Sequence, residues 1–506
     1  MSMKTRKLLS LIAVLTCFIM VFAACEPVSG VNLNNIFTTS LEQKSYEGNA
    51  KITLELVPGE NPSALGELAG ILAFVQGIEL DLYEVKQENA STGSFKGNLN
   101  FGGFTIPVAA SVTVDQVVFQ VEGIERPLVI DLTSSFTQLG IEPDLALLTR
   151  AESDMNKAIF KYLLPNLPNP NKVNYSATTI EVNGQQKNVG KLHAELNGTE
   201  LLELAQVAIR SLAQDEEGLR AFLSEFYDIA APIFQKVIAD LAQDEAEDSD
   251  LLEFVQAYLS NKTLVTEFLY TTITQGYKAA LREIGKFTEE IEEPEALEAS
   301  TLSADIYLDS SLNIIRTEYE LKVSMGQDGG AIIINISSDR WNINGDVRAD
   351  LLDGTNGIDL EGYYMEQEVL SSINPDSLLG QLLSALGYNK KTTYVWLDDY
   401  GIYVDNGTTF VSAFEISWYL DVELDWDSLY TDEIVLYDYT GTTVALPLGQ
   451  NRIIVNGEER SIRRGAFEDE YDYYVPLRAV AEAFGYEVIW DQEFQTIDLI
   501  KTYFQE

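Results

Sequence analysis

The chain contains an internal repeat near its C-terminus, and this repeat restricts the folds open to that part of the sequence. Residues 474–491 have a degraded copy of themselves at residues 410–427. A constant offset over a segment of this length indicates a duplicated structural unit. Four identities survive at an offset of 64 positions: Val411 and Val475, Glu423 and Glu487, Trp426 and Trp490, and Asp427 and Asp491.

The better-preserved copy has the pattern of a strand, a helix and a strand. Pro476 suits the first position of a helix, where its missing N–H costs nothing. Gly485 follows at the point where helices commonly end in the left-handed conformation. Asn456-Gly457 predicts a hairpin with a two-residue turn, as Asn183-Gly184 does earlier in the chain. The apolar stripe of the predicted helix consists of Leu477, Val480, Ala481 and Phe484.

The upstream copy keeps the same pattern in a weaker form. Its apolar stripe consists of Ala413, Ile416 and Leu420. Ser417 interrupts that stripe, and Asp421 stands where the other copy has glycine. We therefore expect two related strand–helix–strand units, of which the first has diverged further.

These residues resemble the copper amine oxidase N-terminal-like module, also called a stalk domain. The resemblance spans residues 391–506, with a degenerate repeat at 391–437 and a second repeat at 450–501. It implies a small α+β unit with an antiparallel sheet curled against a helix, in a surface protein, often of a Gram-positive bacterium. In that family the module is not the catalytic part of amine oxidases. The matching residues are Ile454, Val455, Asn456, Gly457, Tyr474, Val475, Pro476, Leu477, Arg478, Ala479, Val480, Ala481, Glu482, Ala483, Phe484, Gly485, Trp490 and Asp491.

The composition argues against amine oxidase chemistry. The chain has one histidine, His193, and no cysteine beyond Cys25. Copper takes imidazole and thiolate as its natural protein ligands, so a three-histidine copper site cannot be built here. We expect a protein that is not an enzyme and that has no metal or cofactor.

The N-terminal segment has the pattern of a signal peptide. Residues 1–24 combine a positive start with an apolar stretch. The sequence Phe-Ala-Ala-Cys ending at Cys25 resembles a bacterial lipobox, which implies that Cys25 is acylated and becomes the new N-terminus. Residues 25–45 would then form a tether, and the protein would be lipid-anchored on the extracytoplasmic face of the cell membrane. The alternatives are an ordinary secretory signal cut near Ala24 and an uncleaved anchor.

The chain is strongly acidic, with a formal net charge of −46. Such an excess disfavours binding to nucleic acid or to anionic lipid headgroups. Cys17 leaves with the signal and Cys25 carries lipid, so no disulfide is expected and stability must come from the core.

The region before the repeat alternates between strand and helix patterns. Runs of period two over 46–56 and 78–132 predict antiparallel strands, and helical periodicity follows over 199–286. Strands return over 302–341. The predicted fold class is α+β: a curved antiparallel sheet with a helical insert, followed by the small duplicated module.

Two further features concern the same region, residues 46–385. A helix is predicted over 62–75, and residues 165–171 are a candidate break that would divide the region into two domains. The order of strands, helices and strands is similar to that of the lipoprotein carrier fold, in which a curved sheet encloses an apolar pocket. That similarity implies a bound lipid or another hydrophobic ligand.

The candidate chemical residues each have a simpler structural interpretation. In the segment 189–196 the polar side chains alternate with apolar ones, so His193 is predicted to face solvent and not to act as a general base. The acidic runs at 244–250 and 289–295 are interpreted as charged linkers, and 353–359 as a tight turn, in preference to calcium sites.

Several aromatic residues of the C-terminal module are candidates for sugar stacking. Tyr471, Tyr473 and Tyr474 are in this group, but Tyr474 is expected in the strand before the helix and the other two in its loop. Trp426 and Trp490 occupy equivalent repeat positions, which favours core packing.

These observations lead to three hypotheses. The first is a non-catalytic surface lipoprotein with a structural or binding role, held by its lipid and docked on cell-wall polymer or another surface protein. The alternative is a carrier of a hydrophobic ligand in residues 46–385. A hydrolase acting on an envelope polymer has only the abundance of acids in its favour.

Overall fold

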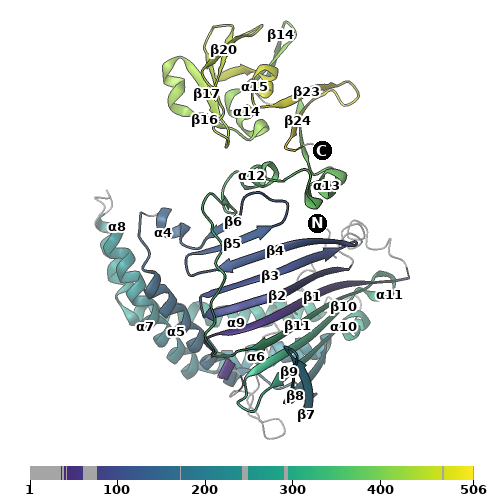
Figure 1. The fold of residues 1–506 in the computed structure, drawn as a ribbon. Coiled ribbons are helices and arrows are strands. Elements are labelled where there is room, and N and C mark those ends of the chain that lie inside the picture. The colour runs from purple at the N-terminus through teal and green to yellow at the C-terminus, as the bar shows by residue number, and fades with distance from the viewer. Residues whose placement is uncertain are drawn as a thin grey trace. The chain divides into compact units, whose positions relative to one another are not determined.

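The computed structural model describes residues 36, 39–40, 43–60, 77–138, 140–170, 172–241, 249–289, 294–399, 401–469 and 472–504. The predicted signal peptide, Cys25, most of the tether and the helix predicted over 62–75 lie outside these residues. The chain divides into two compact units, one of residues 1–121 and 129–354 and the other of residues 122–128 and 355–506 (Figure 1).

The first unit is built on one large sheet. Within it the strand order is β6-β5-β4-β3-β2-β1-β11-β10-β9-β8-β7. Each neighbouring pair from β5 to β7 is antiparallel, which confirms the predicted fold class. The strands are β1 (Tyr46–Pro58), β2 (Ile78–Asn89), β3 (Thr92–Phe101), β4 (Phe104–Val112), β5 (Gln116–Val121), β6 (Leu128–Asp131), β7 (Val173–Val182), β8 (Gln185–Asn197), β9 (Thr301–Leu308), β10 (Ile314–Ser324) and β11 (Gly330–Trp341).

Two halves of the sheet, distant in sequence, meet at its centre. Strand β1 pairs with β11 in an unbroken register from Glu47 opposite Trp341 to Pro58 opposite Gly330. Strands β1 to β6 form one meander, and β7 to β11 form the other half after the first long helix. The segment 165–171, the candidate break between two domains, lies within this first unit.

The sheet has one apolar face and one polar face. Side chains directly opposite one another in neighbouring strands lie on the same face. On β1, Ile52 lies opposite Ile336 of β11 and Leu80 of β2. We call this the apolar face; it contains Ile52, Leu54, Leu56, Ile78, Leu80, Leu99, Ile106, Val108, Ile332, Ile334, Ile336, Leu321, Val323, Leu302, Ala304, Ile306, Leu192, Ala194 and Leu196.

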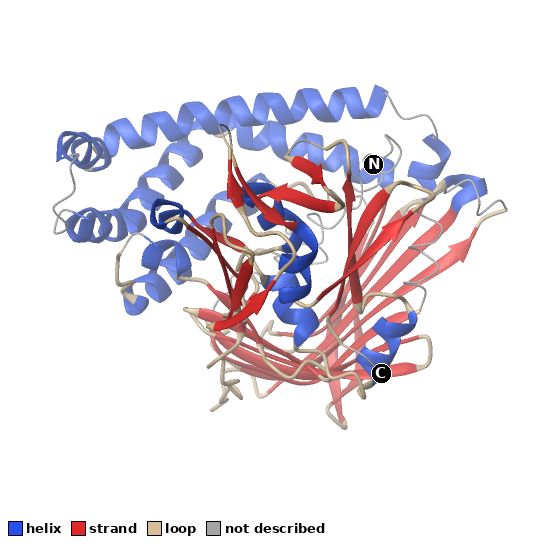
Figure 2. Ribbon diagram, turned by 90° about the horizontal axis from the view of Figure 1, so that it is seen from above, coloured by secondary structure: helices blue, strands red, loops and turns tan. Residues whose placement is uncertain are grey.

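The helices of the first unit lie on one side of the sheet (Figure 2). Helix α6 begins with a capping box, in which Asn197 and Glu200 satisfy each other's backbone N–H groups. Its Leu201 and Leu204 pack on the apolar face at β8 to β10. The helices are α4 (Ser134–Gln138), α5 (Leu145–Leu163), α6 (Gly198–Gln214), α7 (Glu216–Leu241), α8 (Ser249–Leu259), α9 (Lys262–Glu289), α10 (Pro294–Ala299) and α11 (Gly326–Gly329).

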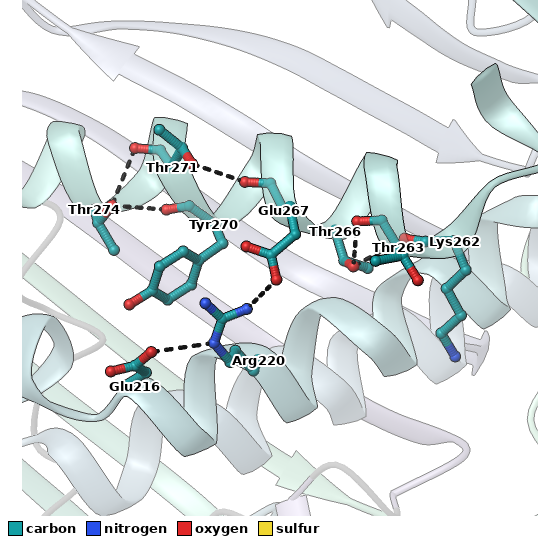
Figure 3. Close-up of polar contacts among 9 residues, drawn as sticks. All are labelled: Glu216, Arg220, Lys262, Thr263, Thr266, Glu267, Tyr270, Thr271 and Thr274. Atoms are coloured by element: carbon teal, nitrogen blue, oxygen red, sulfur yellow. Dashed lines mark hydrogen bonds and ion pairs between the residues drawn. The ribbon is translucent and has the colours of Figure 1, made fainter.

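Polar contacts pin α7 to α9 (Figure 3). Arg220 of α7 donates to Glu216 of its own helix and to Glu267 of α9, and its guanidinium lies 4.0 Å from the ring centroid of Tyr270. The hydroxyls of Thr266 and Thr271 donate to backbone carbonyls within α9, so these polar groups need no water.

The second unit contains the predicted repeat. Its sheets have the orders β13-β24-β23, β14-β15-β22-β21 and β16-β17-β18-β19-β20. The units β15-α14-β16 and β22-α15-β23 are the two predicted copies. The elements are β12 (Ile358–Asp359), α12 (Met365–Ser371), α13 (Leu378–Ala385), β13 (Lys390–Trp396), β14 (Ile402–Asp405), β15 (Thr408–Ser412), α14 (Ala413–Leu420), β16 (Glu423–Asp425), β17 (Glu433–Tyr437), β18 (Thr443–Pro447), β19 (Arg452–Val455), β20 (Glu458–Ser461), β21 (Phe467–Glu468), β22 (Tyr473–Pro476), α15 (Leu477–Ala483), β23 (Tyr486–Asp491) and β24 (Thr496–Thr502).

This unit begins before residue 391, where the resemblance started. The reason lies in backbone pairing with the short segment 122–128. Glu125 N–H donates to the carbonyl of Ser372 at 2.7 Å, and Asn374 N–H donates to that of Gly123 at 2.8 Å. Residues 355–390 are thereby tied into the second unit.

The local signals of the repeat are confirmed, with one shift. Gly485 has φ of 80° and its counterpart Asp421 has φ of 50°, so both helices end in the left-handed conformation. Asn456 and Gly457 also have positive φ, as a tight hairpin turn requires. Pro476 is the residue before α15 and closes β22, one position earlier than predicted.

Candidate binding surfaces

The apolar face of the sheet is covered unevenly. Under α6 it is mostly buried, and Leu302 and Val323 are both 0% exposed. On β1 and β2, Ile52, Leu54 and Leu80 are only half-buried. Ile and Leu are among the residues most often fully buried, and on this half of the face the described helices leave them partly uncovered.

A recess in the first unit lies between α5 and α7. Its wall is mostly apolar, and it leaves room for roughly one water molecule. Lys236 at its edge forms an ion pair of 2.7 Å with Asp240. The apolar lining residues are Phe136, Ile141, Pro143, Leu147, Leu148, Ile233 and Val237.

His193 lies on the polar face of β8, as predicted. Its Nδ1 is 2.7 Å from Asp305 Oδ1 on β9, and Lys191 Nζ is 2.9 Å from the other oxygen of the same carboxylate. The hydrogen bond to Asp305 raises the pKa of Lys191. The trio is a cross-strand polar network on the polar face of the sheet, in which the carboxylate of Asp305 is the shared partner of His193 and Lys191.

The loop 353–359 is a tight turn, as predicted. Asn356 has φ of 58°. Arg126 Nε donates to the carbonyl of Asn356 at 2.9 Å, and Arg126 Nη2 donates to that of Gly357 at 3.0 Å. Two backbone carbonyls of the turn are therefore directed to a guanidinium. In the described part of the chain, no three His, Cys, Asp or Glu side chains gather as metal ligands.

The other two acidic runs fall largely outside the described residues. The parts that are not described are residues 244–248 and 290–293. The described chain resumes with α8 at Ser249 and with α10 at Pro294. No helix in the described part of the chain is long and apolar enough to cross a membrane.

The second unit contains a half-buried lysine that the sequence did not reveal. Lys501 donates to the carbonyl of Phe484 and lies 5.2 Å from the ring centroid of Tyr486. Burial lowers the pKa of Lys501 and raises that of Tyr486, whose hydroxyl donates to the carbonyl of Leu420. Gln367 lines a small recess together with Lys501 and Tyr486, and among the described residues its buried Oε1 has no hydrogen-bond partner. The sequence did not predict this environment of Lys501, because its partners are a backbone carbonyl and an aromatic ring and form no recognisable motif.

Two predictions about aromatic residues were wrong. Trp426 and Trp490 are 58% and 47% exposed, so their equivalent positions do not mean core packing. Both stand beyond the last buried residue of a short strand, where the core ends. Tyr473 lies in β22 and packs against the core, not in the preceding loop. Tyr474 is in β22 as expected, stacked on Phe467 with centroids 5.2 Å apart, and Tyr471 lies outside the described residues.

The architecture is therefore that of a two-unit α+β chain with a duplicated C-terminal module. Residues 392–499 match the copper amine oxidase N-terminal domain. The match spans the two repeats and confirms that resemblance for the C-terminal part of the chain. No curated protein sequence matches this chain.

Proposed function

We propose that this protein is a non-catalytic, lipid-anchored binding protein of the bacterial envelope. The lipobox-like sequence at Cys25 supports attachment, and the match to an N-terminal amine oxidase domain supports a role other than catalysis. The strong negative charge supports a partner that is neither nucleic acid nor an anionic lipid surface.

The function that the geometry supports best is the holding of a hydrophobic ligand by the first unit. The supporting observation is the half-buried part of the apolar face on β1 and β2. Burying apolar surface contributes roughly 25 cal/mol per Å². A bound hydrocarbon chain would bury the remaining exposed surface of Ile52, Leu54 and Leu80. Leu302 under α6 is already fully buried and could not contribute to such binding.

A structural role of the second unit is the other candidate. Both repeats share one buried core, in which Val411, Ile416, Val475 and Val480 are all 0% exposed. A module with one shared buried core is a rigid unit, and a rigid unit could present the rest of the protein on the surface or dock on a wall polymer. Deleting residues 391–506 should then reduce envelope retention of a protein that lacks the lipid; unchanged retention would argue against docking.

Native mass spectrometry tests the ligand directly. A soluble protein that starts at Glu26 should carry an added mass that organic solvent removes. Leu54→Gln places an amide on the apolar face and should abolish the added mass. Glu55→Gln introduces the same side chain on the opposite face of the same strand and should retain it. An unmodified mass after incubation with envelope lipid extract would refute the carrier.

Anchoring has its own test. When cells are fed labelled palmitate, the wild-type protein should become labelled and a Cys25→Ala variant should not. Equal labelling of both would contradict acylation at Cys25, whatever the result for the ligand.

A further inference from the structure

The two repeats differ sharply at two surface positions of their helices. In α15 these positions hold Arg478 and Glu482, which form an ion pair of 3.3 Å. At the same offset α14 holds Phe414 and Trp418, which are 45% and 60% exposed. One copy thus presents an ion pair, whose Arg478 also donates to the carbonyl of Val488, where the other presents two aromatic rings.

Trp426 extends the aromatic surface of the first copy. The ring centroid of Phe414 lies 6.2 Å from that of Trp418 and 6.1 Å from that of Trp426. We call these three residues the aromatic triad. Adjacent exposed rings of this size form a contiguous apolar patch, which is a usual mark of an interaction site.

The fold itself does not require these rings. Both helices bury their other side in the same core, through Ile416 in α14 and Val480 in α15. The second copy does so with Arg478 and Glu482 on its outer side. The second repeat is therefore an internal comparison: it has charged residues at the same structural positions and still forms the buried core.

The charges around the triad indicate the class of partner. Between residues 414 and 433 the chain has no lysine, arginine or histidine. Indole faces attract cations, and Arg stacks on them well. The net charge of −46 repels a second copy of this chain as well as any anionic polymer. The carboxylates of this segment are Glu415, Asp421, Glu423, Asp425, Asp427, Asp432 and Glu433, of which Asp421 is already paired with Lys391.

From this geometry we propose that the aromatic triad is a binding site for a basic polypeptide segment of a partner protein. Arginine or lysine side chains of that segment stack on Trp418 and Trp426, while their charges face the surrounding carboxylates. This site lies in the second unit and is separate from the apolar face proposed to hold a hydrophobic ligand.

The test exchanges the surface pair between the repeats. Phe414→Arg/Trp418→Glu reproduces the residues of the second copy and leaves the formal net charge unchanged, so general electrostatic attraction is preserved. Fluorescein-labelled octa-arginine in 0.15 M salt should bind the variant about tenfold more weakly than the wild-type mature protein. The matched control, Arg478→Glu/Glu482→Arg, also conserves charge and should bind like wild type. Unfolding midpoints of both variants check that the module remains folded.

Two results would overturn the proposal. Equal affinity of the wild type and the aromatic variant would mean that octa-arginine is held by diffuse charge alone. A wild-type protein that ignores octa-arginine but sediments with a neutral polysaccharide, and loses that property in the variant, would assign the triad to a glycan.

Discussion

Val411 and Val475 are equivalent residues of the two repeats, and they lie directly opposite each other in the β15–β22 ladder. The neighbouring pairs follow the same rule, since Phe410 faces Pro476 and Ser412 faces Tyr474. The repeats are therefore related by a local two-fold axis that passes through this valine pair. The two repeats contribute to a single core, and the local two-fold axis passes through that core.

Shortening either valine should destabilise the second unit. Both side chains are 0% exposed, so Val411→Ala and Val475→Ala each leave a void and should cost about 1–3 kcal/mol. The double variant should deviate from additivity, because the two residues share one contact. Tryptophan fluorescence in denaturant measures this, since four of the five tryptophans lie in this unit. Strict additivity would mean that the two valines do not support each other.

A side chain at residue 485 should strain the end of α15. With φ of 80°, Gly485→Ala should cost about 1–2 kcal/mol, although the added methyl meets nothing closer than 3.5 Å. Gly485→Asn should cost less, because asparagine tolerates this conformation. Equal costs for the two variants would show that space, and not backbone conformation, limits the position.

Lys501 should make stability depend on pH. Burial lowers its pKa in the folded protein, so the unfolded chain binds more protons between that lowered pKa and about 10.5. The free energy of unfolding should therefore rise with pH through this window, by at most about 1.4 kcal/mol per pH unit. Lys501→Met should flatten the rise, whereas Lys390→Met at an exposed position should not. A slope that survives in Lys501→Met would assign it to another group.

Above pH 10 the dependence should reverse. Burial raises the pKa of Tyr486 and of Tyr162, so the unfolded chain releases these protons first. Their stabilising contribution is complete below pH 10 and is lost as the pH rises toward the folded-state values. Tyr486→Phe should make the loss less steep in the second unit, as followed by tryptophan fluorescence during alkaline titration. An identical alkaline midpoint and steepness would exclude this tyrosine as a cause.

Removing Arg126 should loosen the turn at 355–359. Its guanidinium satisfies two carbonyls and pairs with Glu368 at 2.7 Å. Arg126→Ala should destabilise the second unit by about 1–2 kcal/mol and speed amide exchange at Ile358. Arg150→Ala, on the exposed side of α5, is the control. The Ile358 N–H also donates to the carbonyl of Pro127 at 2.7 Å, and unchanged exchange at Ile358 would mean that this backbone bond holds the turn alone.

Local features of the fold were predictable because each rests on neighbouring residues. Asn456-Gly457 and Gly485 specify their positive φ values without help from distant parts of the chain. The fold class followed from the change in hydrophobic period between the strands and the helices. The candidate function rested on the same patterns and on the family resemblance.

Other features depend on contacts between residues far apart in sequence. Nothing near Ile52 indicates that it faces Ile336. The exposure of Trp426 was missed because the repeat shows which positions are equivalent and not whether a partner strand extends over them. The environment of Lys501 was missed because it is formed by the carbonyl of Phe484 and the ring of Tyr486.

The pairing of β1 with β11 sets an order of events during synthesis. Until Gly330–Trp341 has emerged, β1 presents a free edge of unpaired backbone groups next to half-buried leucines. Such edges recruit other chains, and closure over so long a span is intrinsically slow. The first unit must therefore remain separated from other copies of the chain until about two-thirds of the polypeptide has been synthesised. We expect chains halted before Gly330 to aggregate.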